Sequence, residues 1–283
     1  MSAGSPSRRF GRVERWGKSL AKDWNNLGKQ AQFYAKTMTS IGDVVVNYRI
    51  ELIRAIAGMS LGTGALLLIG GTVVIVAFLT MFAGAVTAVQ GYNSLLTVGL
   101  DALTGFTAAF VNTRLSAPLI ATVGLAATIG AGATAQIGAM RINEEIDALE
   151  VIGVRSIAYL ASSRVLAGVI VVIPLFCVSV LTSYWAAKFT TILYGQSPGV
   201  YNHYFNTFLN PVDLLWSFAV VIVSAVIVML VHTYYGYNAT GGPAGVGEAV
   251  GRAVRTSLVF AVFANLFVSL AIYGPTGNFH FSG

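Results

Sequence analysis

Five stretches of the sequence are apolar for long enough to cross a membrane as a helix. They run approximately over 63–90, 113–140, 157–187, 212–235 and 253–273. The hydrocarbon core of a bilayer is ~30 Å thick, and a helix needs about 20 apolar residues to cross it. The stretches do not alternate between apolar and polar residues, as the strands of a membrane barrel do. The sequence therefore predicts an all-α membrane protein with about five transmembrane helices.

The composition agrees with a surface that faces lipid. Only 10% of the residues are charged and 55% are hydrophobic, whereas a soluble domain carries roughly 25% charged residues. The single cysteine, Cys177, lies inside an apolar stretch. A disulfide framework within the chain is thereby excluded, and a packing role for Cys177 is expected.

The distribution of positive charge predicts the orientation. The first 60 residues contain ten of the seventeen Lys and Arg residues and four of the eleven acids, so they hold the whole net charge of +6. Connection 91–112 has no Lys or Arg, whereas 141–156 contains Arg141 and Arg155, and 236–255 ends with two arginines. Because positive residues stay on the cytoplasmic side, we expect the N-terminus inside and the C-terminus outside.

The N-terminal region has the pattern of interfacial helices. Apolar residues recur every three or four positions from Phe10 to Leu27, and Lys and Arg fall between them. This spacing predicts a basic amphipathic helix lying on anionic headgroups; a solvated basic tail is the alternative. Segment 41–60 also mixes apolar and charged residues, and we expect it to be interfacial too.

The connection over 141–153 is short, acidic and amphipathic. Ile142, Ile146 and Leu149 form one apolar stripe. Its acids, which point elsewhere, are Glu144, Glu145, Asp147 and Glu150. Such a helix is suited to docking in a groove on a cytoplasmic partner, with the stripe as its anchor. A helix lying on lipid is the alternative, which four acids disfavour because the inner leaflet is itself negative.

The chain lacks the groups that chemistry of its own would need. Its ionisable residues in or beside the apolar stretches fall near their ends: Arg114, Arg164, Lys188, Asp213, His232 and Arg255. The lack of buried acids along the spans disfavours an ion-coupled carrier, and no nucleophile set or metal spacing indicates an enzyme. The glycine-rich stretch 241–251 misses the G-x-G-x-x-G spacing, so we expect a flexible turn there and no cofactor.

Four segments together resemble one known family. They are Gln-Gly-Tyr at 90–92, Thr-Ala-Gln-Ile-Gly-Ala-Met at 134–140, the acidic segment 144–153, and the glycine-rich segment 236–247. The chain resembles, over roughly 40–275, the MlaE/YrbE permeases of MCE-type lipid-transport ABC systems. The basic N-terminal extension and the Gly-Gly-Pro at 241–243 look most like the mycobacterial YrbE proteins.

This resemblance implies an organisation and a set of partners. Residues 1–60 would form cytoplasmic amphipathic and elbow helices, 61–275 the permease domain, and 276–283 a short external tail. The chain would lie in a bacterial plasma membrane beside a second YrbE-type permease, in most cases a different one. A cytoplasmic ABC ATPase dimer would hydrolyse the ATP, MCE proteins would sit outside, and the cargo would be phospholipid, fatty or mycolic acid, or sterol. No nucleic acid is expected as a partner.

The resemblance also implies roles for individual residues. The ATPase-coupling residues would be Ile142, Glu144, Glu145, Ile146, Asp147, Leu149, Glu150 and Gly153. The lipid pathway would include Thr87, Ser94, Leu95, Val98, Arg114 and Gln136, although plain helix packing is the alternative for each. The family often has Glu where this chain has Leu115 or Gln136, and Arg where it has Thr128, so we expect a more apolar cavity. A scaffold that assembles other subunits is the alternative function, and a channel is disfavoured because the spans lack polar rings.

Overall fold

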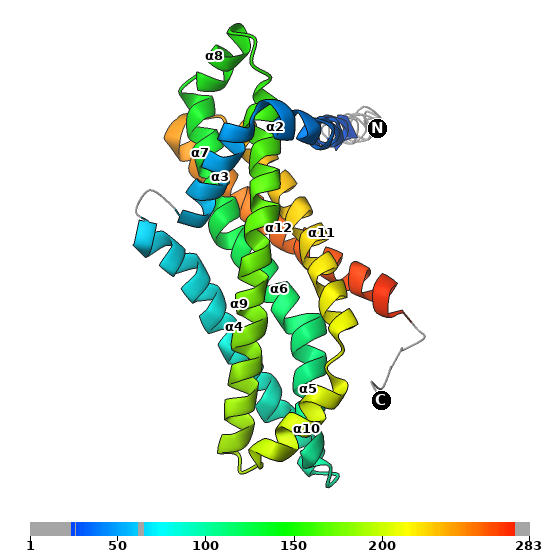
Figure 1. The fold of residues 1–283 in the computed structure, drawn as a ribbon. Helices are drawn as coiled ribbons and strands as arrows, with labels where there is room; N and C mark the ends of the chain where they lie inside the picture. The colour runs from blue at the N-terminus through cyan, green and yellow to red at the C-terminus, as the bar shows by residue number, and fades with distance from the viewer. Residues whose placement is uncertain (1–23, 26, 62–64, 275–283) are drawn as a thin grey trace, which may run out of the picture.

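The computed structural model describes residues 24–25, 27–61 and 65–274. These residues are almost entirely helical and contain no strand (Figure 1). A helical segment over 27–39 leads into α2 (Ile41–Asn47) and α3 (Arg49–Leu61), and α4 (Ala65–Leu96) follows. The next membrane segment is one continuous helical run that includes two π-helical stretches. Its parts are η1 (Asp101–Leu103), α5 (Thr104–Val111), the π-helical η2 (Asn112–Ser116), α6 (Ala117–Gly124), the π-helical η3 (Leu125–Gly130) and α7 (Ala131–Ile142).

The remaining helices complete the bundle. The short α8 (Glu145–Val151) precedes the π-helical η4 (Ile157–Ser162), which continues into α9 (Ser163–Leu193). After these come α10 (Pro198–Phe208), α11 (Pro211–Tyr237) and α12 (Gly242–Tyr273). The end of the molecule that carries α8 is called the α8 end below, and the opposite end is called the α10 end (Figure 1).

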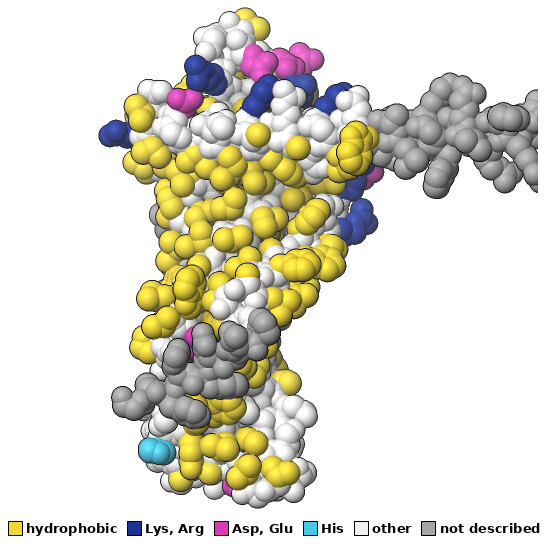
Figure 2. Space-filling model, turned by 90° about the vertical axis from the view of Figure 1, so that its right-hand side faces the viewer, with side chains coloured by type: hydrophobic (Ala, Val, Ile, Leu, Met, Phe, Trp, Pro, Cys, Tyr) yellow, Lys and Arg dark blue, Asp and Glu magenta, His cyan; other side chains and the backbone are white. Residues whose placement is uncertain are grey.

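Among the residues that the structure describes, five helical runs are long and apolar enough to cross a membrane, which confirms the prediction of about five spans. They cover Gly71–Leu96, Asp101–Ile142, Ile157–Leu193, Pro211–Tyr237 and Gly242–Tyr273. Figure 2 shows hydrophobic side chains over the middle of the molecule, while Lys, Arg, Asp and Glu gather at the α8 end. Aromatic side chains such as Phe82 on α4 and Phe267 on α12 are more than half exposed. An apolar belt of this kind is stable when lipid covers it.

Several predicted boundaries are wrong. The second span begins at Asp101, not near residue 113, and the predicted connection 188–211 contains α10. Pro198 occupies the first turn of α10, where its missing N–H is not needed, and Tyr201 is 1% exposed in a cluster with Ala88, Ala108 and Ala187. This burial stabilises a helix whose mixed sequence gives little membrane signal.

The glycine-rich stretch 241–251 is mostly helical, which corrects the expectation of a flexible turn. Only Gly241 and Gly242 have positive φ, at 90° and 70°, and α12 continues from there without a break. A Cβ on Gly245 would lie 1.8 Å from the carbonyl oxygen of Thr240, so the tight entry into α12 requires glycine there.

Small residues let the spans approach closely. A Cβ on Gly84 of α4 would lie 2.3 Å from the backbone oxygen of Ser183 on α9, and one on Gly168 would lie 2.6 Å from Cγ of Met229. The core between α6, α9 and α11 is filled by larger side chains, among them Phe176 and Met229. Close backbone approach supplies the packing that holds helices together in lipid.

The structure describes part of the N-terminal region. Most of the predicted helix from Phe10 to Leu27 lies outside the described residues. The predicted interfacial segment 41–60 forms α2 and α3, which pack beside the start of the α9 run at the α8 end (Figure 1). Ile50 and Ile53 of α3 are 76% and 65% exposed, as suits a helix that contacts lipid.

Candidate functional site

An apolar groove lies between the second span and α12, in the half of the molecule nearer the α10 end. Its volume is about 460 Å³. It is lined by Phe110, Arg114, Leu115, Ser116, Leu119, Val262, Asn265, Leu266, Ser269, Leu270 and Tyr273. The walls are mostly Leu, Val and Phe side chains, so the groove has the chemistry of a site for alkyl chains.

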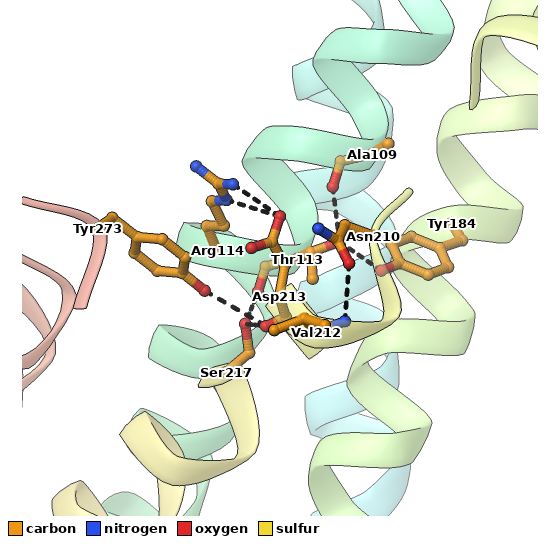
Figure 3. A network of polar contacts seen from close by, with 9 residues as sticks. All are labelled: Ala109, Thr113, Arg114, Tyr184, Asn210, Val212, Asp213, Ser217 and Tyr273. Carbon is orange, nitrogen blue, oxygen red and sulfur yellow. Dashed lines mark hydrogen bonds and ion pairs between the residues drawn. The ribbon is translucent and has the colours of Figure 1, made fainter. Parts of the chain in front are cut away.

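One charged residue of the groove, Arg114, is paired with an acid on another span. The Nε and Nη2 atoms of Arg114 donate to the same oxygen, Oδ2 of Asp213, at 3.1 and 2.6 Å (Figure 3). The two side chains are only 12% and 17% exposed. A charge within the membrane region is costly unless it is paired, and this pairing lets the second span begin twelve residues earlier than predicted.

Two aromatic rings enclose the Arg114 guanidinium. The ring centroids of Phe110 and Tyr273 each lie 4.3 Å from its Cζ atom. The Tyr273 hydroxyl donates to the backbone oxygen of Asp213 at 3.3 Å (Figure 3). The cation thus has an acid on one side and π-faces beside it, and its Nη1 atom points away from the carboxylate in Figure 3.

A hydrogen-bond network fixes this arrangement across neighbouring helices (Figure 3). Ser217 of α11 donates to the backbone oxygen of Thr113 at 2.7 Å, and the Thr113 hydroxyl contacts the Tyr184 hydroxyl of α9. Asn210 accepts from the backbone N–H of Val212 at 2.9 Å and so caps α11 just before Asp213. Parts of the second span, α9, α11 and α12 therefore meet at one point beside the groove.

The predicted lipid-pathway residues do not gather in one place. Gln136 lines a second groove of about 370 Å³, together with residues of α3, α4 and the second span such as Met59, Thr72 and Thr128. The remaining four, Thr87, Ser94, Leu95 and Val98, line neither groove.

Those four residues lie at the α10 end of α4 and in the turn that follows it. Thr87 donates back to the carbonyl oxygen of Ala83 in its own helix at 2.8 Å, and Ser94 pairs with Gln90 at 3.3 Å. Val98 is 65% exposed. Within this chain, these contacts are those of helix surface and turn, and a lipid-pathway role for the four stays a prediction.

The acidic segment 141–153 is placed differently from its predicted docking pose. Ile146 is fully buried against Ile137 of α7 and Leu160 of η4, and Leu149 packs on the same cluster. The expectation that the stripe is free to anchor a partner is therefore wrong for Ile146. Ile146 and Leu149 share one face of α8, and that face packs on the chain's own core, whereas Ile142 ends α7 and lies outside this cluster.

Polar contacts hold α8 in this position. Glu150 accepts from the hydroxyls of Ser156 and Tyr237 at 2.6 and 3.1 Å, and Arg141 pairs with Asp147 at 2.7 Å. Glu144, before α8, has a φ of 61° and makes the turn out of α7. Val151, the last residue of α8, and Ile152, which follows it, are large apolar residues that are 87% and 73% exposed. The assignment of 142–153 to ATPase coupling stays a prediction.

Asp213 is the site residue that the sequence interpretation misses. Arg114 and Asp213 both fall at predicted outer ends of spans, and that shared depth is the signal that could have paired them. In the part of the chain that the structure describes, no three His, Cys, Asp or Glu side chains come together as metal ligands.

Comparison with known proteins decides the family. The family described as Permease MlaE matches residues 61–271, which is most of the chain. The chain belongs to the MlaE permease family. A "Probable ABC transporter permease protein" of Rickettsia bellii is 27% identical over 255 residues, covering 87% of this chain and 95% of that protein. This MlaE-family chain is thus the permease subunit of an ABC transporter, a multi-pass membrane protein that works with an ATPase.

Two further relatives extend the range of the family. A "Probable ABC transporter permease protein" of Synechocystis is 28% identical over 198 residues, covering 70% of this chain and 75% of that protein. The Arabidopsis thaliana chloroplast protein "TRIGALACTOSYLDIACYLGLYCEROL 1" is 27% identical over 199 residues, covering 70% of this chain and 57% of that protein. Its name refers to a glycolipid. The likeness to mycobacterial YrbE proteins stays a prediction.

Proposed function

We propose that this permease moves lipids between a bacterial plasma membrane and an external MCE protein conduit. The observation that carries the proposal is the groove beside Arg114. Its apolar walls suit acyl or sterol groups, and its charge is neutralised by Asp213 and enclosed by aromatic rings. A phospholipid, a fatty or mycolic acid, or a sterol would each present the long apolar body that such walls accept.

The orientation follows from charge. The α8 end, where Lys, Arg, Asp and Glu gather, lies in the cytoplasm, because positively charged segments are retained there (Figure 2). With five spans the groove then opens in the outer half of the membrane and the C-terminus is outside. This placement brings the groove toward MCE proteins on the outer side and toward the second YrbE-type permease, with which the chain forms a heterodimer.

The conformational change that ATP hydrolysis causes in the partner ATPases is transmitted to the groove through α8. The accessible parts of this helix are its acids and the exposed pair Val151 and Ile152. The buried Ile146 and the hydrogen bonds of Glu150 connect it to α7, η4 and α11. Movement of α8 would therefore be transmitted to the spans by packing, and the chain itself needs no catalytic residue.

A filled groove tests this function. Ser269→Trp places an indole in the groove, whereas Ala271→Trp adds the same volume at an exposed position two residues along α12. In proteoliposomes that hold the whole complex, lipid transfer should be lost in Ser269→Trp and kept in Ala271→Trp, with assembly of the complex intact in both. Normal transfer by Ser269→Trp would favour the alternative, a scaffold that does not transport.

A further inference from the structure

The junction of α2 and α3 forms a pocket of about 410 Å³ at the α8 end. Arg49, Glu51 and Arg54 line it from α3, and Tyr159 lines it from η4. It is separate from both grooves described above, since it shares no lining residue with either. We call it the elbow pocket.

Positive charge exceeds negative charge in and behind the elbow pocket. Arg54 donates to Oε2 of Glu51 at 2.9 Å, and the Tyr159 hydroxyl donates to the same oxygen at 2.9 Å. Arg164 of α9 is 8% exposed and also interacts electrostatically with Glu51. The single carboxylate of Glu51 therefore interacts with two arginines and accepts a hydrogen bond from a tyrosine hydroxyl.

Backbone oxygens bond these cations without neutralising them. The Nε of Arg49 donates to the carbonyl oxygen of Val45 at 2.6 Å, and Nη1 of Arg164 donates to that of Leu160 at 3.2 Å. The other acid of α2 and α3, Asp43, is paired with Arg155 at 2.8 Å. Arg49, Arg54 and Arg164 against Glu51 leave a local charge of +2.

The rim of the elbow pocket is apolar and aromatic. Val46 and Ile50 line the pocket and are 66% and 76% exposed, and Ile53, farther along α3, is 65% exposed. Tyr48 and Tyr159 stack edge-to-face with their centroids 5.6 Å apart. Exposed aliphatic side chains beside tyrosines and arginines mark the depth at which acyl chains meet headgroups. Arginine is suited to phosphate there because its donors form a planar fork.

We propose that the elbow pocket binds the phosphate of an anionic phospholipid from the leaflet at the α8 end. This lipid is a fixed component that anchors the α2–α3 elbow, and it is distinct from any cargo in the groove near the α10 end. The phosphate supplies the negative charge that Glu51 alone does not, and the acyl chains cover Ile50 and Ile53. The proposal does not depend on which molecule the permease transports.

Native mass spectrometry of the complete complex tests the proposal. The complex would be extracted from membranes of mixed phosphatidylglycerol and phosphatidylcholine, and the retained lipid counted. Each basic residue near a membrane adds a factor of about five to the binding of an anionic lipid. The double variant Arg49→Gln, Arg54→Gln should therefore retain roughly 25-fold less phosphatidylglycerol, with unchanged retention of phosphatidylcholine.

Two further variants make the result decisive. Arg252→Gln is the matched control, because Arg252 also pairs with an acid on its own helix but lies outside the pocket; its lipid retention should equal that of the native complex. Glu51→Gln removes the negative charge and keeps an oxygen acceptor for Tyr159, so its retention should rise. Loss in Arg252→Gln equal to that in the double variant, or no gain in Glu51→Gln, would overturn the proposal.

Inorganic phosphate distinguishes a lipid from a free anion. Excess inorganic phosphate should leave the bound phosphatidylglycerol in place, because the acyl chains hold the lipid against the apolar rim. Complete displacement of the lipid by inorganic phosphate would show that the pocket binds a free anion, and the lipid proposal would be wrong.

Discussion

Arg114 and Asp213 lie 99 residues apart in sequence and form a two-bond ion pair inside the membrane region, with both bonds to one carboxylate oxygen. The pair joins the second span to α11 beside the groove, and Tyr273 joins α12 to it through the backbone of Asp213. The residues that give the groove its one charge are therefore also residues that hold three spans together.

Breaking this pair on one side should destabilise the protein more than removing both charges. Arg114→Gln or Asp213→Asn leaves a largely buried charge without its partner, which costs about 3 kcal/mol or more. The double variant leaves no unpaired charge and should recover much of that loss. Thermal unfolding of the four proteins in lipid nanodiscs measures the coupling. Equal losses that simply add in the double variant would contradict the pairing.

The two faces of α8 should respond differently to the same substitution. Ile146→Asp puts a carboxylate into the buried cluster with Ile137 and Leu160, so α8 should detach and the protein should unfold more easily. Ile152→Asp changes a side chain that is 73% exposed, so thermal stability should stay within about 0.5 kcal/mol of the native value.

Co-purification with the ATPase separates these variants further. Ile152→Asp should lose the ATPase while keeping its fold, because its exposed apolar contact is replaced by a charge. If a well-folded Ile152→Asp protein still binds the ATPase and supports ATP turnover, the exposed end of α8 is not required for coupling.

Close helix approach at Gly84 can be tested with a single methyl group. A Cβ there would lie 2.3 Å from the backbone oxygen of Ser183, so Gly84→Ala should force α4 and α9 apart and cost about 1–3 kcal/mol. A Cβ added to Gly132 would meet no neighbouring helix within 4 Å among the described residues, so Gly132→Ala should be neutral or slightly stabilising. Unfolding in nanodiscs compares the two, and similar stabilities would show that α4 and α9 are not in close contact.

The hydroxyl of Tyr34 should lose its proton at a higher pH than that of an exposed tyrosine. Burial raises the pKa of Tyr34 from 10.0 to about 12, with the bond from Gln30 opposing the shift. Because the folded state keeps this proton longer than the unfolded state does, its contribution to stability is constant below pH 10 and is lost between pH 10 and 12. The ultraviolet difference spectrum between native protein and Tyr34→Phe should show tyrosinate forming near pH 12; formation near pH 10 would mean that the hydroxyl is in water.

The spans could be predicted from the sequence because each is a long apolar run, and membrane insertion depends on that property directly. The span boundary near Arg114 could not be predicted. A charged residue is taken as the end of a span unless its ion-pair partner is known, and the partner, Asp213, is distant in the sequence. The amphipathic pattern of 142–153 is visible in the sequence, but which surface covers Ile146 depends on Ile137 and Leu160, which only the folded chain brings together. The spacing of apolar residues predicts which face of a helix is apolar, but it does not predict which residues pack against that face.

Lipid cross-linking during ATP turnover tests whether lipid passes through the groove beside Arg114. A photo-reactive amino acid would replace Leu266, which lines the groove near Arg114, or Leu181, which is 67% exposed on α9 and lines neither groove. In the reconstituted complex, ATP hydrolysis should change the yield of lipid adducts at Leu266 and leave the yield at Leu181 constant. Adduct yields that ignore ATP at both positions, or that change equally at both, would contradict a groove that moves lipid.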